Sequence, residues 1–231
     1  MSIIVSQMVE FPSNGHTTPG YIAHPDDGRS YPGIIVIQEW WGLVDHIKEM
    51  CERFAAAGFV ALAPDLYHGQ KADEPDEARK LAMALDIDRA LYEIQSAAIH
   101  LQNSEIVSSE KIGVVGWCMG GMAAFQTAVN SGEANIGAVV GFYGRPPTSE
   151  EVPKINAPVL GLFGDLDQGI PVETVQQFAD DLEANNKTHH IEIYKEANHA
   201  FFNDTRPQIY NETAAKDAWQ RTQDWFNLYL T

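Results

Sequence analysis

The sequence predicts an α/β fold with a mostly parallel central sheet, helices on both faces and an antiparallel edge at the N-terminus. Short apolar runs rich in Val and Ile alternate along the chain with longer segments of helical periodicity. This alternation is typical of a parallel sheet that is covered on both faces. The first thirty residues differ, because extended pieces lie around Asn14-Gly15 and over residues 20–23, which indicates an antiparallel hairpin.

The individual elements follow from the same patterns. Strands are expected where continuous apolar runs can be buried on both faces, within residues 31–37, 59–63, 111–116, 136–142, 157–163 and 190–194. Helices are expected where apolar residues recur at helical spacing, over residues 44–57, 74–103, 119–130, 172–185 and 214–230. Gly58 ends the first of these helices, and the long segment 74–103 is expected to divide into two helices near Asp86.

Length and composition fit one soluble domain over residues 1–231. The formal charge of −17, from 15 Lys and Arg against 32 Asp and Glu, argues against nucleic acid and anionic membranes as partners. Two cysteines make no disulfide framework, which favours a reducing compartment. No apolar run is long enough to span a membrane, and residues 1–7 lack the basic region of a signal peptide. We therefore expect a cytoplasmic protein.

Residues 111–121 carry the strongest functional signal, a strand followed by Gly-x-Cys-x-Gly and a helix. Gly116 and Gly120 permit a tight turn that lifts Cys118 above the sheet edge, where the helix N-terminus favours a thiolate. The backbone N–H of Met119 would face an oxyanion forming on a substrate carbonyl. The alternative is that Cys118 is a small buried residue and that the glycines only allow close packing. The order of strand, turn and helix favours a nucleophile.

A nucleophile needs a base and an orienting acid, which follow it along the chain in the hydrolase order of acid, then histidine. Asp165 and Asp167 follow the strand that ends near residue 163, and His199 follows the last strand. Asp167 is preferred because Asp165, one residue past a glycine, could instead cap the turn. His199 is preferred as the base, and the alternative is that it is a histidine in a surface loop. His68 also lies close after a strand end, but it precedes the nucleophile in the sequence and so does not fit the hydrolase order.

Six short segments together resemble the dienelactone hydrolase family, a branch of the α/β-hydrolase fold. They are residues 38–42, 64–67, 116–121, 142–144, 164–167 and 199–201. The resemblance extends from about residue 20 to about residue 228, and the Gln-Glu pair at residues 38–39 beside a cysteine elbow is specific to the family. It implies a catalytic triad of Cys118, His199 and Asp167 that hydrolyses an ester or lactone through a thioester.

The resemblance also implies roles around the triad. Glu39 corresponds to a glutamate that shelters the resting thiol and helps to take its proton; its alternative is a solvated loop carboxylate. The N–H of Trp40 resembles the second oxyanion donor beside that of Met119. Burial against Trp40 and Trp41 would raise the proton affinity of Glu39. Four side chains are predicted at the substrate pocket: Tyr143, Trp117, Phe201 and Asn203. For Trp117 a position in the core is the favoured alternative, whereas Tyr143 could equally be a half-buried aromatic residue with its hydroxyl in solvent.

The chain departs from the family at the arginines that grip the carboxylate of dienelactone. Asn203 stands where one arginine is expected, and residues 71–79 contain no clear match for the other. Arg79, Arg145 or Arg206 could substitute, although each is also explained as a surface residue. The negative net charge would also slow the approach of an anion. We therefore predict that the substrate is not dienelactone itself.

These observations predict a hydrolase of a small-molecule ester or lactone. No metal or organic cofactor is expected, and Cys51, on the apolar face of a helix, is predicted to be a core residue. A monomer is the default expectation and a dimer the alternative. Two other readings remain open: a thiol redox or oxidant-sensing protein that uses Cys118, and a non-catalytic binding protein that retains the fold.

Overall fold

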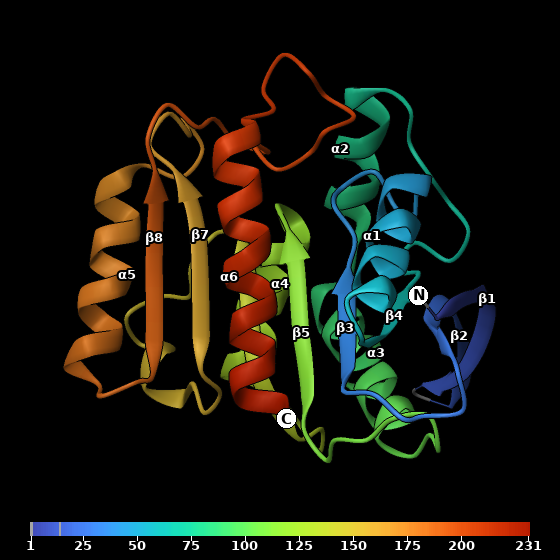
Figure 1. Cartoon of the computed structure of the whole chain (residues 1–231). Helices are drawn as coiled ribbons and strands as arrows, with labels where there is room; N and C mark the ends of the chain where they lie inside the picture. Colours follow the sequence, from blue (N-terminus) through green and yellow to red (C-terminus); the bar gives the residue numbers. More distant parts are fainter. Residues whose placement is uncertain (1, 14) are drawn as a thin grey trace.

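The computed structural model describes residues 2–13 and 15–231, so Met1 and the expected turn residue Asn14 lie outside the described residues. Its eight-stranded sheet has the order β1-β2-β4-β3-β5-β6-β7-β8 (Figure 1). The strands are β1 Ile3–Ser13, β2 His16–Asp26, β3 Gly33–Ile37, β4 Val60–Pro64, β5 Ile112–Trp117, β6 Ile136–Phe142, β7 Val159–Gly164 and β8 His189–Tyr194. The helices are α1 Asp45–Ala56, α2 Pro75–Ala84, α3 Ile87–Gln102, α4 Met119–Val129, α5 Val172–Ala184 and α6 Glu212–Leu230, with a short 3₁₀ turn, η1 Val152–Lys154.

The pairing of the strands confirms the predicted fold class. From β4 through β3 to β8 every neighbouring pair is parallel, whereas β2 is antiparallel to both β4 and β1. The N-terminal hairpin is longer than expected, because β1 and β2 pair along their whole lengths from Ile3 opposite Asp26 to Ser13 opposite His16. The break expected near Asp86 is present, and Asp86 caps α3 by accepting a hydrogen bond from the N–H of Arg89.

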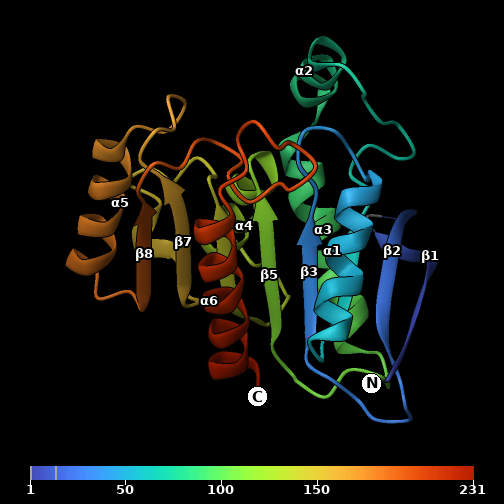
Figure 2. The ribbon, with the colours of Figure 1, turned by 45° about the horizontal axis from the view of Figure 1, so that its top comes forward.

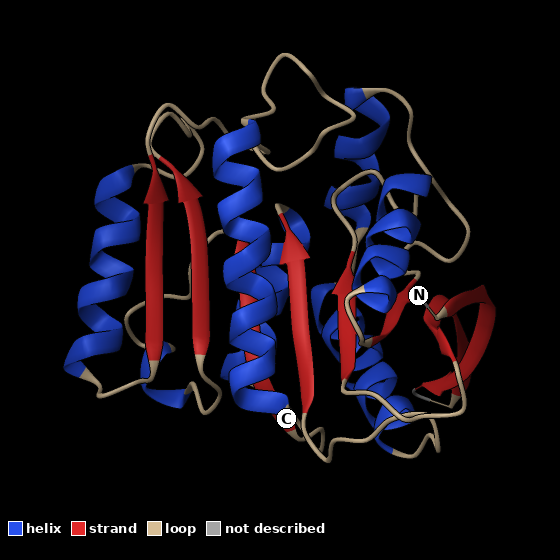
Figure 3. Ribbon diagram, viewed as in Figure 1, coloured by secondary structure: helices blue, strands red, loops and turns tan. Residues whose placement is uncertain are grey.

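Two apolar layers cover the sheet, one on each face. Along β3, Ile34 and Val36 pack in the layer formed with α1 and α6. Ile35 and Ile37 point the other way, into the layer formed with α3, α4 and α5. Figures 2 and 3 show α1 and α6 on the near face of the sheet with α3 and α4 behind it. Burial on both faces explains why these strands appear in the sequence as continuous apolar runs.

The parallel strands all end at the same edge of the sheet, which lies at the top of Figure 1. The loops that leave β3, β5, β6, β7 and β8 at this edge carry Glu39, Cys118, Tyr143, Asp167 and His199. Ligands of such sheets bind at this edge. Among residues 2–13 and 15–231, no helix combines the length and the apolar character needed to cross a membrane.

Candidate active site

The turn between β5 and α4 holds Cys118 in a conformation that few residues adopt. Its φ of 56° and ψ of −115° place it in a strained region just before the first turn of α4. A Cβ atom on Gly116 would lie 2.1 Å from the carbonyl oxygen of Gly120, and one on Gly120 would lie 2.5 Å from that of Gln38. Only glycine therefore fits at positions 116 and 120, two residues before and two residues after Cys118. Strain of this kind costs roughly 1–3 kcal/mol and is concentrated at functional sites.

His199 and Asp167 form a close pair beside this turn. Nδ1 of His199 lies 2.6 Å from Oδ2 of Asp167, whose side chain is buried. The other carboxylate oxygen of Asp167 accepts hydrogen bonds from the backbone N–H groups of Gly169 and Ile170. Asp165 instead accepts a bond from the N–H of Ala197 at 3.3 Å and so secures the loop that carries the histidine. The carboxylate that meets His199 is thus that of Asp167.

The protonation of His199 depends on both of its neighbours. Burial by itself lowers the pKa of the imidazole. The hydrogen bond to Asp167, the nearby sulfur of Cys118 and the negative charges of these two groups outweigh burial and raise the pKa of His199 to about 10. The ring is therefore an imidazolium at neutral pH as long as negative charge resides on the sulfur of Cys118.

Glu39 is buried in the loop after β3. Burial raises its pKa above the usual range, while the hydrogen bond from Asn203 and the charges of His199 and Arg206 oppose this rise. The bond joins Nδ2 of Asn203 to Oε2 of Glu39 at 2.9 Å. Oδ1 of Asn203 in turn accepts bonds from the N–H and hydroxyl groups of Thr205. Asn203, expected at the substrate pocket, is buried and binds Glu39.

Two tyrosines adjoin Cys118. Tyr143, directly after β6, is 1 % exposed and its ring centroid lies 5.0 Å from that of His199. Tyr67, from the loop after β4, donates a hydrogen bond from its hydroxyl to Sδ of Met119 at 3.4 Å. Burial and, second, the charge of Cys118 raise the pKa of Tyr67 to about 12. The sequence predicts no role for Tyr67, although it belongs to a segment that resembles the family. Its position in the loop after β4 is the feature that could have identified it as a site residue.

The backbone N–H groups of Trp40 and Met119, the two predicted oxyanion donors, have no acceptor among the described residues. Met119 is the first residue of α4, where an N–H group has no acceptor within the helix. Within the described parts of the chain, the N–H group of Trp40 has no backbone or side-chain acceptor. The two predicted oxyanion donors are therefore uncommitted, as such a role requires.

A groove of about 440 Å³ opens beside His199. It is lined by Leu166, Asp167, Gln168, Gly169, Asn198, His199, Arg206 and Ile209. Trp117 and Phe201, both predicted to line the pocket, are 1 % and 0 % exposed and lie in the apolar layer behind it. Trp117 stacks on Phe142 at 5.3 Å, and Phe201 contacts the ring of Tyr143 at 5.4 Å. These two side chains support the wall of the site from behind.

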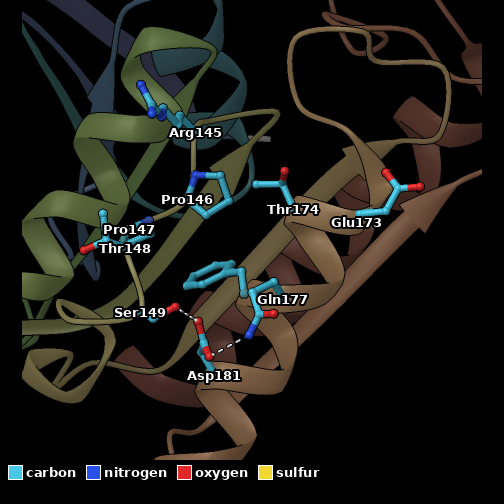
Figure 4. Close-up of a pocket in the computed structure, with 10 residues that line it drawn as sticks. Arg145, Pro146, Pro147, Thr148, Ser149, Glu173, Thr174, Gln177 and Asp181 are labelled. Carbon is cyan, nitrogen blue, oxygen red and sulfur yellow. Dashed lines mark hydrogen bonds between the residues drawn. The ribbon is translucent and has the colours of Figure 1, made fainter.

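The three candidate arginines have different surroundings. Arg206 lines the groove beside His199, and its charge acts on both Glu39 and Tyr143. Arg145 lines a separate pocket between the loop after β6 and the start of α5, where its side chain points away from Asp181 (Figure 4). Arg79 is exposed on α2, 4.0 Å from Asp76. Only Arg206 of these three adjoins the site.

Within residues 2–13 and 15–231, no three or more His, Cys, Asp or Glu side chains are grouped so that they could hold a metal ion. Cys51 is buried in the apolar layer under α1, and burial strongly raises the pKa of its thiol. The remaining cysteine, Cys118, is half-buried at the sheet edge.

A mostly parallel sheet with a strained residue between strand and helix, and a His–Asp pair beside it, defines an α/β-hydrolase. Residues 18–230 match the family model described as the dienelactone hydrolase family. Protein usf of Aquifex pyrophilus is 37 % identical over 234 residues, covering 98 % of this chain and 100 % of that protein. An Aquifex aeolicus protein provisionally named carboxymethylenebutenolidase is 32 % identical over 236 residues, covering 98 % and 100 %.

A solved structure agrees with these relatives. The crystal structure of a provisionally named dienelactone hydrolase from Klebsiella pneumoniae is 32 % identical and superposes with a TM-score of 0.89, covering 98 % of this chain and 100 % of that one. The chain belongs to the dienelactone hydrolase family. Membership confirms the predicted fold and the predicted class, a carboxylic ester or lactone hydrolase.

Proposed function

We propose that this hydrolase cleaves a small carboxylic ester or lactone through a thioester on Cys118. The observation that carries the proposal is the pair formed by His199 and Asp167 at 2.6 Å, which lies close enough to Cys118 for negative charge on its sulfur to raise the pKa of His199. The three residues come from loops after three different strands, β5, β7 and β8. A nucleophile, a base and an orienting carboxylate are the parts that acyl transfer requires.

In the acylation step the sulfur of Cys118 attacks the carbonyl carbon. The negative charge moves to the carbonyl oxygen, where the N–H groups of Trp40 and Met119 would bind it. When the tetrahedral intermediate collapses, the C–O bond breaks and the leaving alkoxide takes the proton of the His199 imidazolium. The products of this half-reaction are an alcohol and a thioester, or a single ring-opened acyl group when the substrate is a lactone.

In the deacylation step His199 acts as a base. The thioester sulfur carries no charge, so Cys118 no longer raises the pKa of the ring. Neutral His199 then takes a proton from water, and the resulting hydroxide attacks the thioester. Cys118 leaves as the thiolate, and the carboxylic acid product is released. Asp167 holds the ring in the tautomer that both steps use.

The proposed substrate is uncharged next to the scissile bond and is not dienelactone. Asn203, at the place where the family has an arginine, is already bound to Glu39. The groove beside His199 offers apolar surface from Leu166 and Ile209, and the chain carries a charge of −17. We expect faster hydrolysis of a neutral lactone than of the same lactone bearing a carboxylate. Faster hydrolysis of the lactone that bears the carboxylate, with this advantage lost in Arg206→Ala, would contradict the expectation.

The direct test compares the native protein with Cys118→Ala on an activated aryl ester and a simple lactone. We expect turnover by the native protein only, together with a transient mass increase equal to the acyl group. Cys51→Ala is the matched control, because that thiol is buried away from the sheet edge. Equal activity or equal inactivity of the native protein and Cys118→Ala would exclude Cys118 as the nucleophile for these substrates.

A further inference from the structure

The hydroxyl group of Tyr143, whose ring centroid lies 5.0 Å from that of His199, is a buried donor. Tyr143 is 1 % exposed, and among the residues that the structure describes its Oη has no hydrogen-bond partner. Buried hydroxyl groups are nearly always paired, because an unpaired one has lost the hydrogen bonds that it makes to water in the unfolded chain. Burying this hydroxyl without a partner therefore costs free energy, and the surrounding structure must hold the side chain in place.

The backbone around Tyr143 maintains this position. Its φ of 35° lies in the left-handed region that residues with a side chain disfavour. The N–H group of Tyr143 is bound to the carbonyl oxygen of Leu162, and a Cβ atom on Gly144 would lie 2.2 Å from the carbonyl carbon of Gly121. The close approach of these two glycines leaves the loop little freedom. Such strain persists only where the surroundings impose it.

Two groups that can carry negative charge, Glu39 and Cys118, act on this hydroxyl. Burial, and then the charges of Glu39 and Cys118, raise the pKa of Tyr143 well above its ordinary value, and the charge of Arg206 opposes them. The hydroxyl therefore keeps its proton at neutral pH. It offers a hydrogen-bond donor to anions that form within the site, but it does not supply a proton itself.

We propose that Tyr143 is a further catalytic residue, whose hydroxyl donates a hydrogen bond to the sulfur of Cys118 when the thiol becomes a thiolate. Neutral sulfur is a weak acceptor, whereas a thiolate accepts a strong charge-assisted bond. The proton leaving the sulfur goes to His199, and Tyr143 retains its own. The bond is lost again when the sulfur becomes acylated. The catalytic part of this inference rests on the proposed function; the stabilisation of the thiolate does not.

The test is the pH dependence of alkylation of Cys118 by iodoacetamide, with intact mass used to count adducts. In Tyr143→Phe we expect the midpoint of the rate profile to rise by about one pH unit, which is about tenfold slower alkylation below both midpoints. Thermal stability should not fall, because the substitution removes an unpaired hydroxyl and leaves the ring in place. An unchanged midpoint would overturn the proposal.

The matched control is Tyr194→Phe. The hydroxyl of Tyr194 donates a hydrogen bond to Asp217 at 2.8 Å, so its removal should lower stability and leave the alkylation profile unchanged. If Tyr143→Phe does not fold, 3-fluorotyrosine at position 143 provides a stronger donor of nearly the same shape. It should move the midpoint downward, and a shift in the opposite direction or none would reject the donor role.

Ester turnover by the same variants separates the two proposals. If the native protein hydrolyses no ester or lactone but the midpoint still rises in Tyr143→Phe, the proposed function fails and the thiolate donor remains. If esters are hydrolysed and neither the midpoint nor kcat changes in Tyr143→Phe, the proposed function remains and the role of Tyr143 is rejected. We expect both a raised midpoint and a kcat lowered about tenfold or more.

Discussion

Asn203 donates a hydrogen bond from Nδ2 to Oε2 of Glu39 at 2.9 Å, joining the loop after β8 to the loop after β3. Both side chains are buried, and the amide oxygen of Asn203 is held by Thr205. A neutral amide therefore fixes a buried carboxyl group beside the candidate triad. The protonation of Glu39 depends on this contact, since the bond from Asn203 is the first of the influences that oppose the effect of burial.

Replacing Asn203 by Ala should raise the pKa of Glu39 further, because the carboxylate loses its donor while it remains buried. Because the family resemblance implies that ionised Glu39 helps to take the proton of Cys118, we expect the acid limb of the kcat/KM profile to move to higher pH. The free energy of unfolding should fall by about 1–3 kcal/mol. Thr205→Val, which removes only the hydroxyl bond to Asn203, should shift the limb less. A larger effect of Thr205→Val would contradict this assignment.

Replacing Glu39 by Gln should stabilise the protein at neutral and alkaline pH. The folded pKa of Glu39 is raised, so its contribution to stability is fully present below the unfolded pKa and is lost as the pH rises through the folded value. Each unit of this shift is worth about 1.4 kcal/mol. The difference in unfolding free energy between Glu39→Gln and native protein should therefore grow above about pH 4.5. Denaturant titrations at pH 4 and pH 8 measure it, and no difference between them would contradict the burial argument.

Replacing Asp167 by Asn should lower kcat by about a thousandfold or more, because the amide cannot hold the same tautomer of His199. Asp165→Asn is the matched control, two residues away. Asp165 accepts only a weak bond from the N–H of Ala197, so we expect less than about a tenfold loss. Equal losses in the two variants would mean that the contact at 2.6 Å does not set the rate.

Replacing Gly116 by Ala should disrupt the turn at Cys118, since the added carbon would lie 2.1 Å from the carbonyl oxygen of Gly120. We expect a loss of about 3 kcal/mol in the free energy of unfolding, together with loss of activity. At Gly15, where no described atom lies within 4 Å of an added Cβ, only the left-handed backbone conformation opposes Ala. Gly15→Ala should cost about 1 kcal/mol, measured by thermal unfolding, and leave activity intact.

Much of the fold could be predicted because the sheet is made of elements that are local in sequence. Burial on both faces requires continuous apolar runs, so β3 to β7 are visible in the chain. The bounds of these strands differ from the predicted ones by a few residues at most. The hairpin was harder to delimit, because β1 lies at the sheet edge and its alternating exposed residues resemble those of a polar loop.

The sequence by itself determined that Cys118, Asp167 and His199 lie at one edge of the sheet. Each lies in the loop that follows a strand, and parallel strands share the edge at which they end. Tertiary structure decided which carboxylate meets His199: the turn after β7 directs Asp167 to the imidazole and Asp165 to a backbone N–H group. The sequence favours Asp167 because Asp165 could cap the turn, but only the path of the backbone orients the two side chains.

Tertiary structure also decided which residues from distant parts of the chain complete the site. Arg206 adjoins His199 while Arg145 lines another pocket, although both follow strand ends. Asn203 reaches Glu39 because β8 and β3 end at the same edge and the long loop after β8 folds back over it. Such contacts depend on strand order and on the packing of loops, which bring together side chains that no local pattern relates.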